Sequence, residues 1–176
     1  MDSEDRRTKI INILNNMNKP IKGMVLAEKL NVSRQIIVQD IALLRAKGEN
    51  IISTPQGYII LKGEKSNKIV KTIVCKHEGN HAIEDELNSI VDMGGEILDV
   101  IVEHPIYGEI KSPLMIGSRL EVANFMENLR KTNAEPLSSL TDGVHIHSIQ
   151  VDNEDVFEKI KKILDRKSTR LNSSHR

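Results

Sequence analysis

The chain has 176 residues, in which 25 Lys and Arg residues balance 25 Asp and Glu residues. This length fits one large domain or two small ones, and the single cysteine, Cys75, excludes a disulfide framework within the chain. No apolar run approaches the roughly 18 residues of a membrane-spanning helix, so we expect a soluble, cytoplasmic protein with no membrane partner.

The balanced charge hides an asymmetry along the chain. Residues 1–63 carry 10 Lys and Arg against 6 Asp and Glu, a net charge of +4, whereas residues 64–165 carry 11 against 19, a net charge of −8. The first block is therefore suited to a polyanion such as DNA, and the second would be repelled by one. Aromatic residues make up only 2% of the chain, which argues against a stacking platform for single-stranded bases.

The first block, residues 1–63, has the pattern of three helices followed by a wing. Apolar spacing predicts helices over residues 4–17 and 23–30, and a third helix that Ser33 caps and Gly48 ends. Residues 50–61 then predict two short strands. This is a winged helix-turn-helix domain, and the stretch AEKLNVSRQIIVQDIALLR resembles the helix-turn-helix of the biotin-repressor type.

The third helix of such a domain reads duplex DNA from the major groove, where Arg pairs with guanine and Gln with adenine. We predict that double-stranded operator DNA is contacted by polar residues at the exposed start of this helix: Ser33, Arg34, Gln35 and Gln39. The alternative, that the winged helix is a protein-interaction module, is disfavoured by the positive charge of the block.

The second block predicts an α+β domain over residues 64–165. Strands are expected over residues 69–76, 96–103, 107–115 and 144–151, with helices over 82–93, 119–132 and 154–164. The first six elements make the β-α-β-β-α-β order of a ferredoxin-like sandwich, an antiparallel sheet with helices on one face. In such a sheet the last strand pairs with the first.

This pairing predicts a metal site. Alternation along a strand places His145 and His147 on one face, and the strand pairing brings His77 near them, with Glu86 as a fourth ligand. Three imidazoles and a carboxylate suit a divalent transition metal such as nickel, zinc, iron or manganese. His81 is an alternative to His77, and Glu84 and Asp85 are alternatives to Glu86; a solvated polar face is the competing interpretation.

The connection between the second and third strands of this block, VEHPIYGEIKSP, carries His104 and Tyr107. Both side chains can donate hydrogen bonds to a carboxylate or contact a ring nitrogen, so we treat them as candidate ligand-binding residues. The competing interpretation is an ordinary hairpin with two polar residues.

Three motifs, KH…EDEL, DVIVEHPIYGEI and GVHIHSI, follow the helix-turn-helix in this order. Together they closely resemble the three-histidine domain of the niacin-responsive repressors of NAD biosynthesis in Gram-positive bacteria. The resemblance implies a homodimeric repressor that binds operator DNA when nicotinic acid is present as corepressor. It also implies a metal held by His77, Glu86, His145 and His147.

Two rival functions follow from the same residues: a metal-sensing regulator, and a metal-dependent hydrolase fused to a DNA-binding domain. No general base and no phosphate-binding glycine loop stand out, so we expect no enzyme activity. Residues 166–176, RKSTRLNSSHR, predict a disordered tail because they contain one apolar residue. The tail also resembles translated adapter read-through, which suggests a non-native origin.

Overall fold

The computed structural model describes residues 1–63 and 66–173, with side chains as far as residue 167. It divides into two compact units, Met1–Lys65 and Ser66–Arg176. The boundary predicted after residue 63 lies close to this division. Each unit has its own hydrophobic core.

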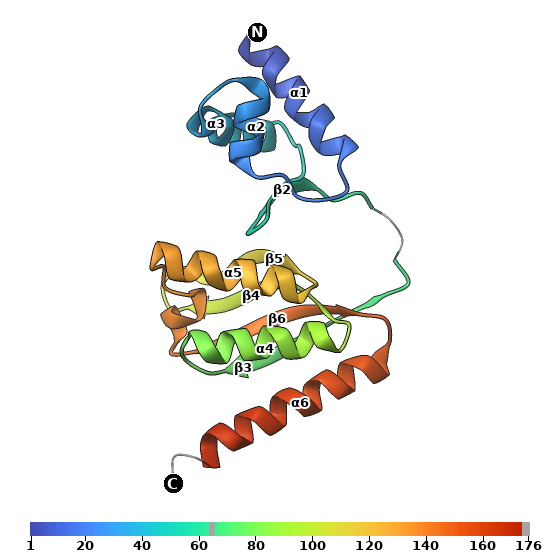
Figure 1. The fold of residues 1–176 in the computed structure, drawn as a ribbon, viewed down its shortest axis with the longest axis vertical. Coiled ribbons are helices and arrows are strands. Elements are labelled where there is room, and N and C mark those ends of the chain that lie inside the picture. The colour runs from blue at the N-terminus through green and yellow to red at the C-terminus, as the bar shows by residue number, and fades with distance from the viewer. Residues whose placement is uncertain (64–65, 174–176) are drawn as a thin grey trace. The chain divides into compact units, whose positions relative to one another are not determined.

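The first unit is a winged helix-turn-helix domain, as the sequence predicts. Its elements are α1 (Ser3–Asn16), α2 (Gly23–Leu30), α3 (Arg34–Ala46), β1 (Ile51–Thr54) and β2 (Gly57–Ile60) (Figure 1). The core gathers one face of each helix and includes Ile10, Leu26 and Ile37. Ser33 caps α3 by accepting a hydrogen bond from the backbone N–H of Ile36.

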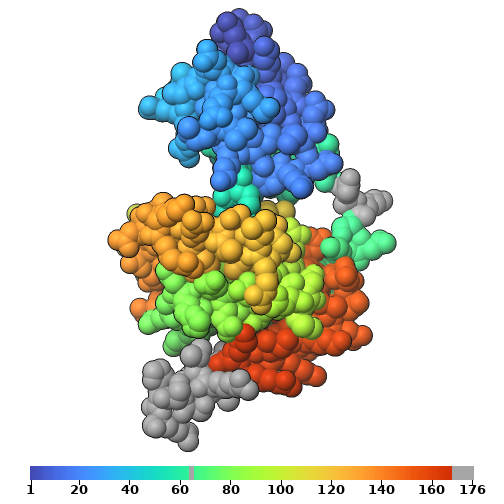
Figure 2. Space-filling view, in the orientation of Figure 1, coloured from blue at the N-terminus to red at the C-terminus, as the bar shows by residue number. Residues whose placement is uncertain are grey.

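The second unit packs three helices against an antiparallel sheet. Its elements are β3 (Ile69–Lys76), α4 (Asn80–Asp92), β4 (Glu96–His104), β5 (Gly108–Ile116), α5 (Arg119–Thr132), the 3-10 helix η1 (Leu137–Thr141), β6 (Val144–Val151) and α6 (Glu154–Ser173). Figure 2 shows α4 packed between α5 and α6. One core lies between helices and sheet, where Ile90 of α4 meets Ile149 of β6 and Ile160 of α6. The α+β class is therefore confirmed.

The strand order differs from the ferredoxin-like prediction. The sheet runs β3-β6-β4-β5, so the last strand lies inside the sheet and the first strand at an edge, whereas a ferredoxin-like sheet has the first strand inside. The predicted antiparallel pairing of first and last strands is present. The reason for the order lies in burial: β6 is buried on both faces over His147–Ile149, while β3 exposes alternate residues and carries lysines typical of an edge.

The prediction of a disordered tail from residue 166 is wrong for residues 166–173, which continue α6 to Ser173. No glycine or proline interrupts residues 154–173, and extending an existing helix costs little once its first turn has formed. Lys167 also anchors this part of the helix, since its ammonium group lies 2.7 Å from the Asp85 carboxylate and 2.6 Å from the Ser89 hydroxyl. Residues 174–176 lie outside the described part of the chain.

Candidate metal centre and DNA-binding face

The DNA-binding candidates lie together on the outer face of α3. Ile37, Ile41 and Leu44 of this helix are buried, and this fixes the opposite face toward solvent. The exposed side chains at its start include the four predicted ones, Ser33, Arg34, Gln35 and Gln39, together with Val38. A buried ion pair holds this face in place, because Asp40, at 2% exposure, bonds to Arg6 of α1.

The wing is fastened to the loop before α2. Ile21 and Tyr58 exchange two backbone hydrogen bonds, of 2.9 and 2.8 Å. Gly57 permits this approach, since a Cβ atom there would lie 2.3 Å from the carbonyl oxygen of Ile21. The strand pair is thus set beside the helices by a position that only glycine fills.

The histidine cluster is built by β3, α4 and β6. Alternation along β6 turns His145 and His147 toward the helix-covered face, where both are buried. β3 pairs with β6 so that Cys75 lies opposite His145, and His77 follows two residues later. Glu86, on the inner face of α4, is 5% exposed and completes the group.

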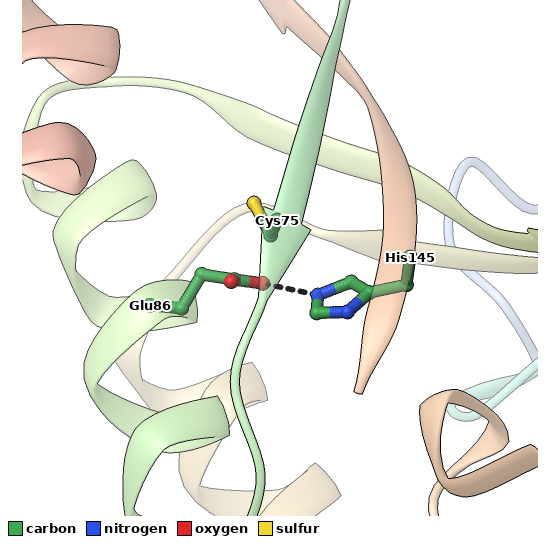
Figure 3. Close-up of side chains that lie close together, drawn as sticks. All are labelled: Cys75, Glu86 and His145. Atoms are coloured by element: carbon green, nitrogen blue, oxygen red, sulfur yellow. Dashed lines mark hydrogen bonds and ion pairs between the residues drawn. The ribbon is translucent and has the colours of Figure 1, made fainter. Parts of the chain in front are cut away.

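The three imidazoles converge on the Glu86 carboxylate. The Nε2 atoms of His145 and His147 lie 3.1 and 2.7 Å from Glu86 Oε1, and His77 Nε2 contacts Oε2. Figure 3 shows Glu86 and His145 reaching toward each other from α4 and β6. Residues far apart in the sequence therefore meet with their ligand atoms facing one another.

Backbone carbonyls orient two of the three rings. The Nδ1 atom of His145 donates to the carbonyl of Gly143 at 2.8 Å, and Nδ1 of His147 donates to the carbonyl of Asp99 at 2.7 Å. A carbonyl can only accept, so Nδ1 carries the proton in both rings. In a neutral ring Nε2 then presents a lone pair to the carboxylate, and a positive charge is needed between them.

Protons supply part of this charge in the metal-free protein. Burial would raise the pKa of Glu86, but hydrogen bonds from His145, His147 and His77 outweigh it and hold the pKa well below its ordinary value of 4.5. Burial would lower the pKa of His145, but its hydrogen bond to Glu86 and the charge of that carboxylate raise the pKa above 6.5.

The donor set also fits a divalent transition metal. Imidazoles with Nδ1 held by backbone carbonyls and Nε2 directed inward are the usual arrangement of histidine ligands. His77 Nδ1 is buried and has no hydrogen-bond partner among the described residues, so no tautomer is imposed on this ring. A cation bound to the three Nε2 atoms and the carboxylate would balance the charge of Glu86 with neutral imidazoles, and the proton of the His77 ring would then lie on Nδ1.

The alternative ligands named from the sequence lie elsewhere. His81 is exposed, Glu84 pairs with Arg130 at 3.2 Å, and Asp85 pairs with Lys167. Helical periodicity explains this result, because α4 turns Glu86 toward the sheet and its two acidic neighbours toward solvent.

His104 and Tyr107 lie at the β4–β5 hairpin. His104 Nδ1 accepts hydrogen bonds from the backbone N–H groups of Ile106 and Tyr107, at 3.1 and 3.2 Å, and the two rings lie 5.0 Å apart. Tyr107 is 77% exposed. Among the interactions of the described residues, none joins either side chain to the histidine cluster, so their ligand-binding role stays a prediction.

A pocket of about 260 Å³ opens beside His77. Loop and η1 residues line it together with His77, and three of them, Glu78, Glu135 and Asp142, are acidic; no Lys or Arg is among the lining residues. An anionic ligand would be repelled there unless a cation lay nearby. The lining residues themselves therefore offer no positive charge to a carboxylate.

Sequence reasoning missed three contributors: Gly143, Asp99 and Cys75. The backbone carbonyls of Gly143 and Asp99 leave no signal in residue type. Cys75 could have been found, because strand alternation places it on the same face as His77, and the predicted pairing of first and last strands places both near His145.

Comparison with known proteins completes these observations. Residues 6–59 match the HTH domain family, and residues 70–173 match the 3H domain family. The chain is 42% identical to the probable transcription repressor NiaR of Thermotoga maritima, over 93% of this chain and 92% of that protein. It is also 42% identical to the transcription repressor NadR of Bacillus subtilis, over 85% of this chain and 84% of that protein. Across the described residues, no helix is both long and apolar enough to cross a membrane.

Proposed function

The chain belongs to the family of transcription repressors that join a helix-turn-helix domain to a 3H domain, and we propose that it represses genes of NAD biosynthesis or niacin uptake with nicotinic acid as corepressor. It is a DNA-binding regulator and not an enzyme. The observation that carries the proposal is the convergence of three imidazoles on Glu86, in the same motifs that resemble the niacin-responsive repressors.

In this proposal His77, Glu86, His145 and His147 hold one divalent transition metal ion. The ion would supply a Lewis-acidic position for the carboxylate or the pyridine nitrogen of nicotinic acid. Nicotinic acid would need this metal ion in order to bind in the acidic pocket beside His77, because the residues that line the pocket offer no cation. The Ser138 hydroxyl and the Asn80 amide, which also line it, provide hydrogen-bond donors, whereas the Ser139 hydroxyl already donates to the Pro136 carbonyl at 2.7 Å.

The proposal includes a homodimer, because helix-turn-helix repressors commonly bind two half-sites with one recognition helix each. Two copies of α3 related by a two-fold axis would bind half-sites about 34–36 Å apart, or a multiple of that spacing. The outer face of the sheet gives a second copy an apolar contact. Across this face Val74, 69% exposed, neighbours Ile146 of β6, which neighbours Ile101 of β4. Val70 and Val144 are also exposed on this face, where they pair with Gln150 and Lys76.

The test is a fluorescence anisotropy titration of full-length protein on an operator selected from a random duplex library. With metal present, nicotinic acid should tighten operator binding by about 5–150-fold, the usual range of allosteric coupling. Nicotinamide, which lacks the carboxylate, is the matched control and should have a much smaller effect. Equal operator affinity with and without nicotinic acid would contradict the corepressor role.

A second candidate function is metal sensing. One observation favours it: the four-ligand cluster is complete without any organic ligand. The same titration separates the two functions. If metal alone produces the full gain in operator affinity, the protein senses the metal; if the gain requires metal and nicotinic acid together, the corepressor proposal stands.

A further inference from the structure

Cys75 lies at the histidine cluster, although the four-residue ligand set does not include it. Its position in β3 is directly opposite His145 in the register with β6. The side chain is buried, at 9% exposure. Figure 3 shows it beside the Glu86 carboxylate, which His145 approaches from β6.

The distances suit a shared ion. Cys75 Sγ, a carboxylate oxygen of Glu86 and a ring nitrogen of His145 all lie within 4.8 Å of one another. Metal–sulfur bonds of about 2.3 Å and metal–nitrogen bonds of about 2.0–2.1 Å allow two donors on one ion to be up to about 4.4 Å apart. Small side-chain movements are therefore sufficient to bring all three donors onto one cation.

Two further observations place Cys75 within reach of the ligand set. His77 follows Cys75 by two residues, and its Nε2 contacts Oε2 of the same Glu86 carboxylate that lies beside Cys75. A pocket of about 60 Å³ reaches Cys75, His77 and Glu86 between β3, α4 and α6. The residues that line this pocket thus include Cys75 and two of the four proposed ligands.

We propose that Cys75 is an additional ligand of the metal centre, bound as a thiolate. The inference rests on the metal site of the proposed function. On binding, the S–H bond breaks, the proton passes to water, and a sulfur–metal bond forms. A thiolate is a soft donor, so Cys75 biases the site toward zinc, cobalt or nickel and away from manganese.

The alternative is that Cys75 is a small residue of the hydrophobic core, to which it also belongs. Cobalt(II) spectroscopy of the full chain distinguishes the two roles. Because Cys75 is the only cysteine, any sulfur-to-cobalt charge-transfer band in the near ultraviolet must come from it. We expect that band in the wild type and its loss in Cys75→Ser, with the visible cobalt bands retained in both proteins.

Zinc and manganese affinities provide the second measurement. Cys75→Ser and Cys75→Ala should weaken zinc binding by about ten-fold or more and manganese binding much less. Stoichiometric cobalt binding without a sulfur band, and with an unchanged zinc affinity in the variants, would overturn the role of Cys75 and leave the four-ligand site intact. Failure of the wild type to bind any of these metals would overturn both.

Discussion

The carbonyl oxygen of Gly143 accepts the Nδ1 proton of His145 at 2.8 Å, and it also accepts the backbone N–H of His77 at 3.3 Å. The Gly143 carbonyl thereby orients the His145 ring and also holds the backbone of His77, just after the end of β3. Gly143 has φ +88°, and a Cβ atom there would lie 2.4 Å from the carbonyl oxygen of His77. The geometry of the cluster thus depends on a residue with no side chain.

Gly143→Ala should destabilise the protein and weaken metal binding, because the new methyl group collides with the backbone of His77. Gly94→Ala is the matched control: its φ is +86° and nothing lies within 4 Å of the added atom. The control variant should lose only about 1–2 kcal/mol of unfolding free energy, which is the cost of a non-glycine residue in the left-handed conformation. Urea unfolding should show a larger loss for Gly143→Ala, and equal losses would mean that the close approach is unimportant.

The stability of the metal-free protein should depend on pH through Glu86 and His145. The pKa of Glu86 is lowered in the folded state, so its contribution is present above about 4.5 and is lost as pH falls through the folded pKa. The pKa of His145 is raised, so its contribution is present below 6.5 and is lost as pH rises through the folded pKa. We expect greatest stability between these two values.

Glu86→Gln checks this assignment, because the amide keeps the shape and removes the charge. Thermal unfolding of the chelator-treated variant should lose the decline in stability above pH 6.5 that the wild type shows. A decline of the same size in both proteins would show that other groups cause it.

Arg34→Ala should weaken operator binding by about 1–3 kcal/mol, the usual value of a specific base contact, and relax the preference for one base pair. Gln39→Ala is predicted to act similarly at another base pair. Lys131→Ala, which removes an exposed cation on α5, is the control and should leave binding unchanged. A uniform loss across all sequences would reassign Arg34 to a phosphate contact.

Val74→Lys should convert the proposed dimer to a monomer, because it places a charge beside Ile146 on the outer face of the sheet. Leu120→Lys is the control: Leu120 is 71% exposed on α5, away from that face. Sedimentation velocity measures the outcome. A Val74→Lys protein that sediments as the wild-type dimer would place the interface elsewhere.

Local patterns were sufficient to predict most elements of the fold. The apolar spacing within α3 is a local pattern, so the exposed face of this helix could be predicted from the sequence. The alternation within β6 is also local, so the placement of His145 and His147 on one face could be predicted as well. Helical spacing places Glu86 and Asp85 on different faces of α4. Which of these faces is turned toward the histidines can be decided only when the position of the sheet is known.

The strand order and the supporting groups of the site depend on contacts between distant segments. The local sequences of β3 and β6 do not show which of these strands lies at the edge of the sheet. The backbone carbonyls of Gly143 and Asp99 orient the rings of His145 and His147, and a backbone group leaves no signal in residue type. The low apolar content of residues 166–173 does not predict the extension of α6, which depends in part on the contact between Lys167 and Asp85.

Anomalous X-ray diffraction from crystals grown with nickel locates the metal. We expect one strong anomalous peak within coordination distance of the Glu86 carboxylate and of the Nε2 atoms of His77, His145 and His147. A peak located elsewhere, or none at the cluster after growth with saturating nickel, would contradict it.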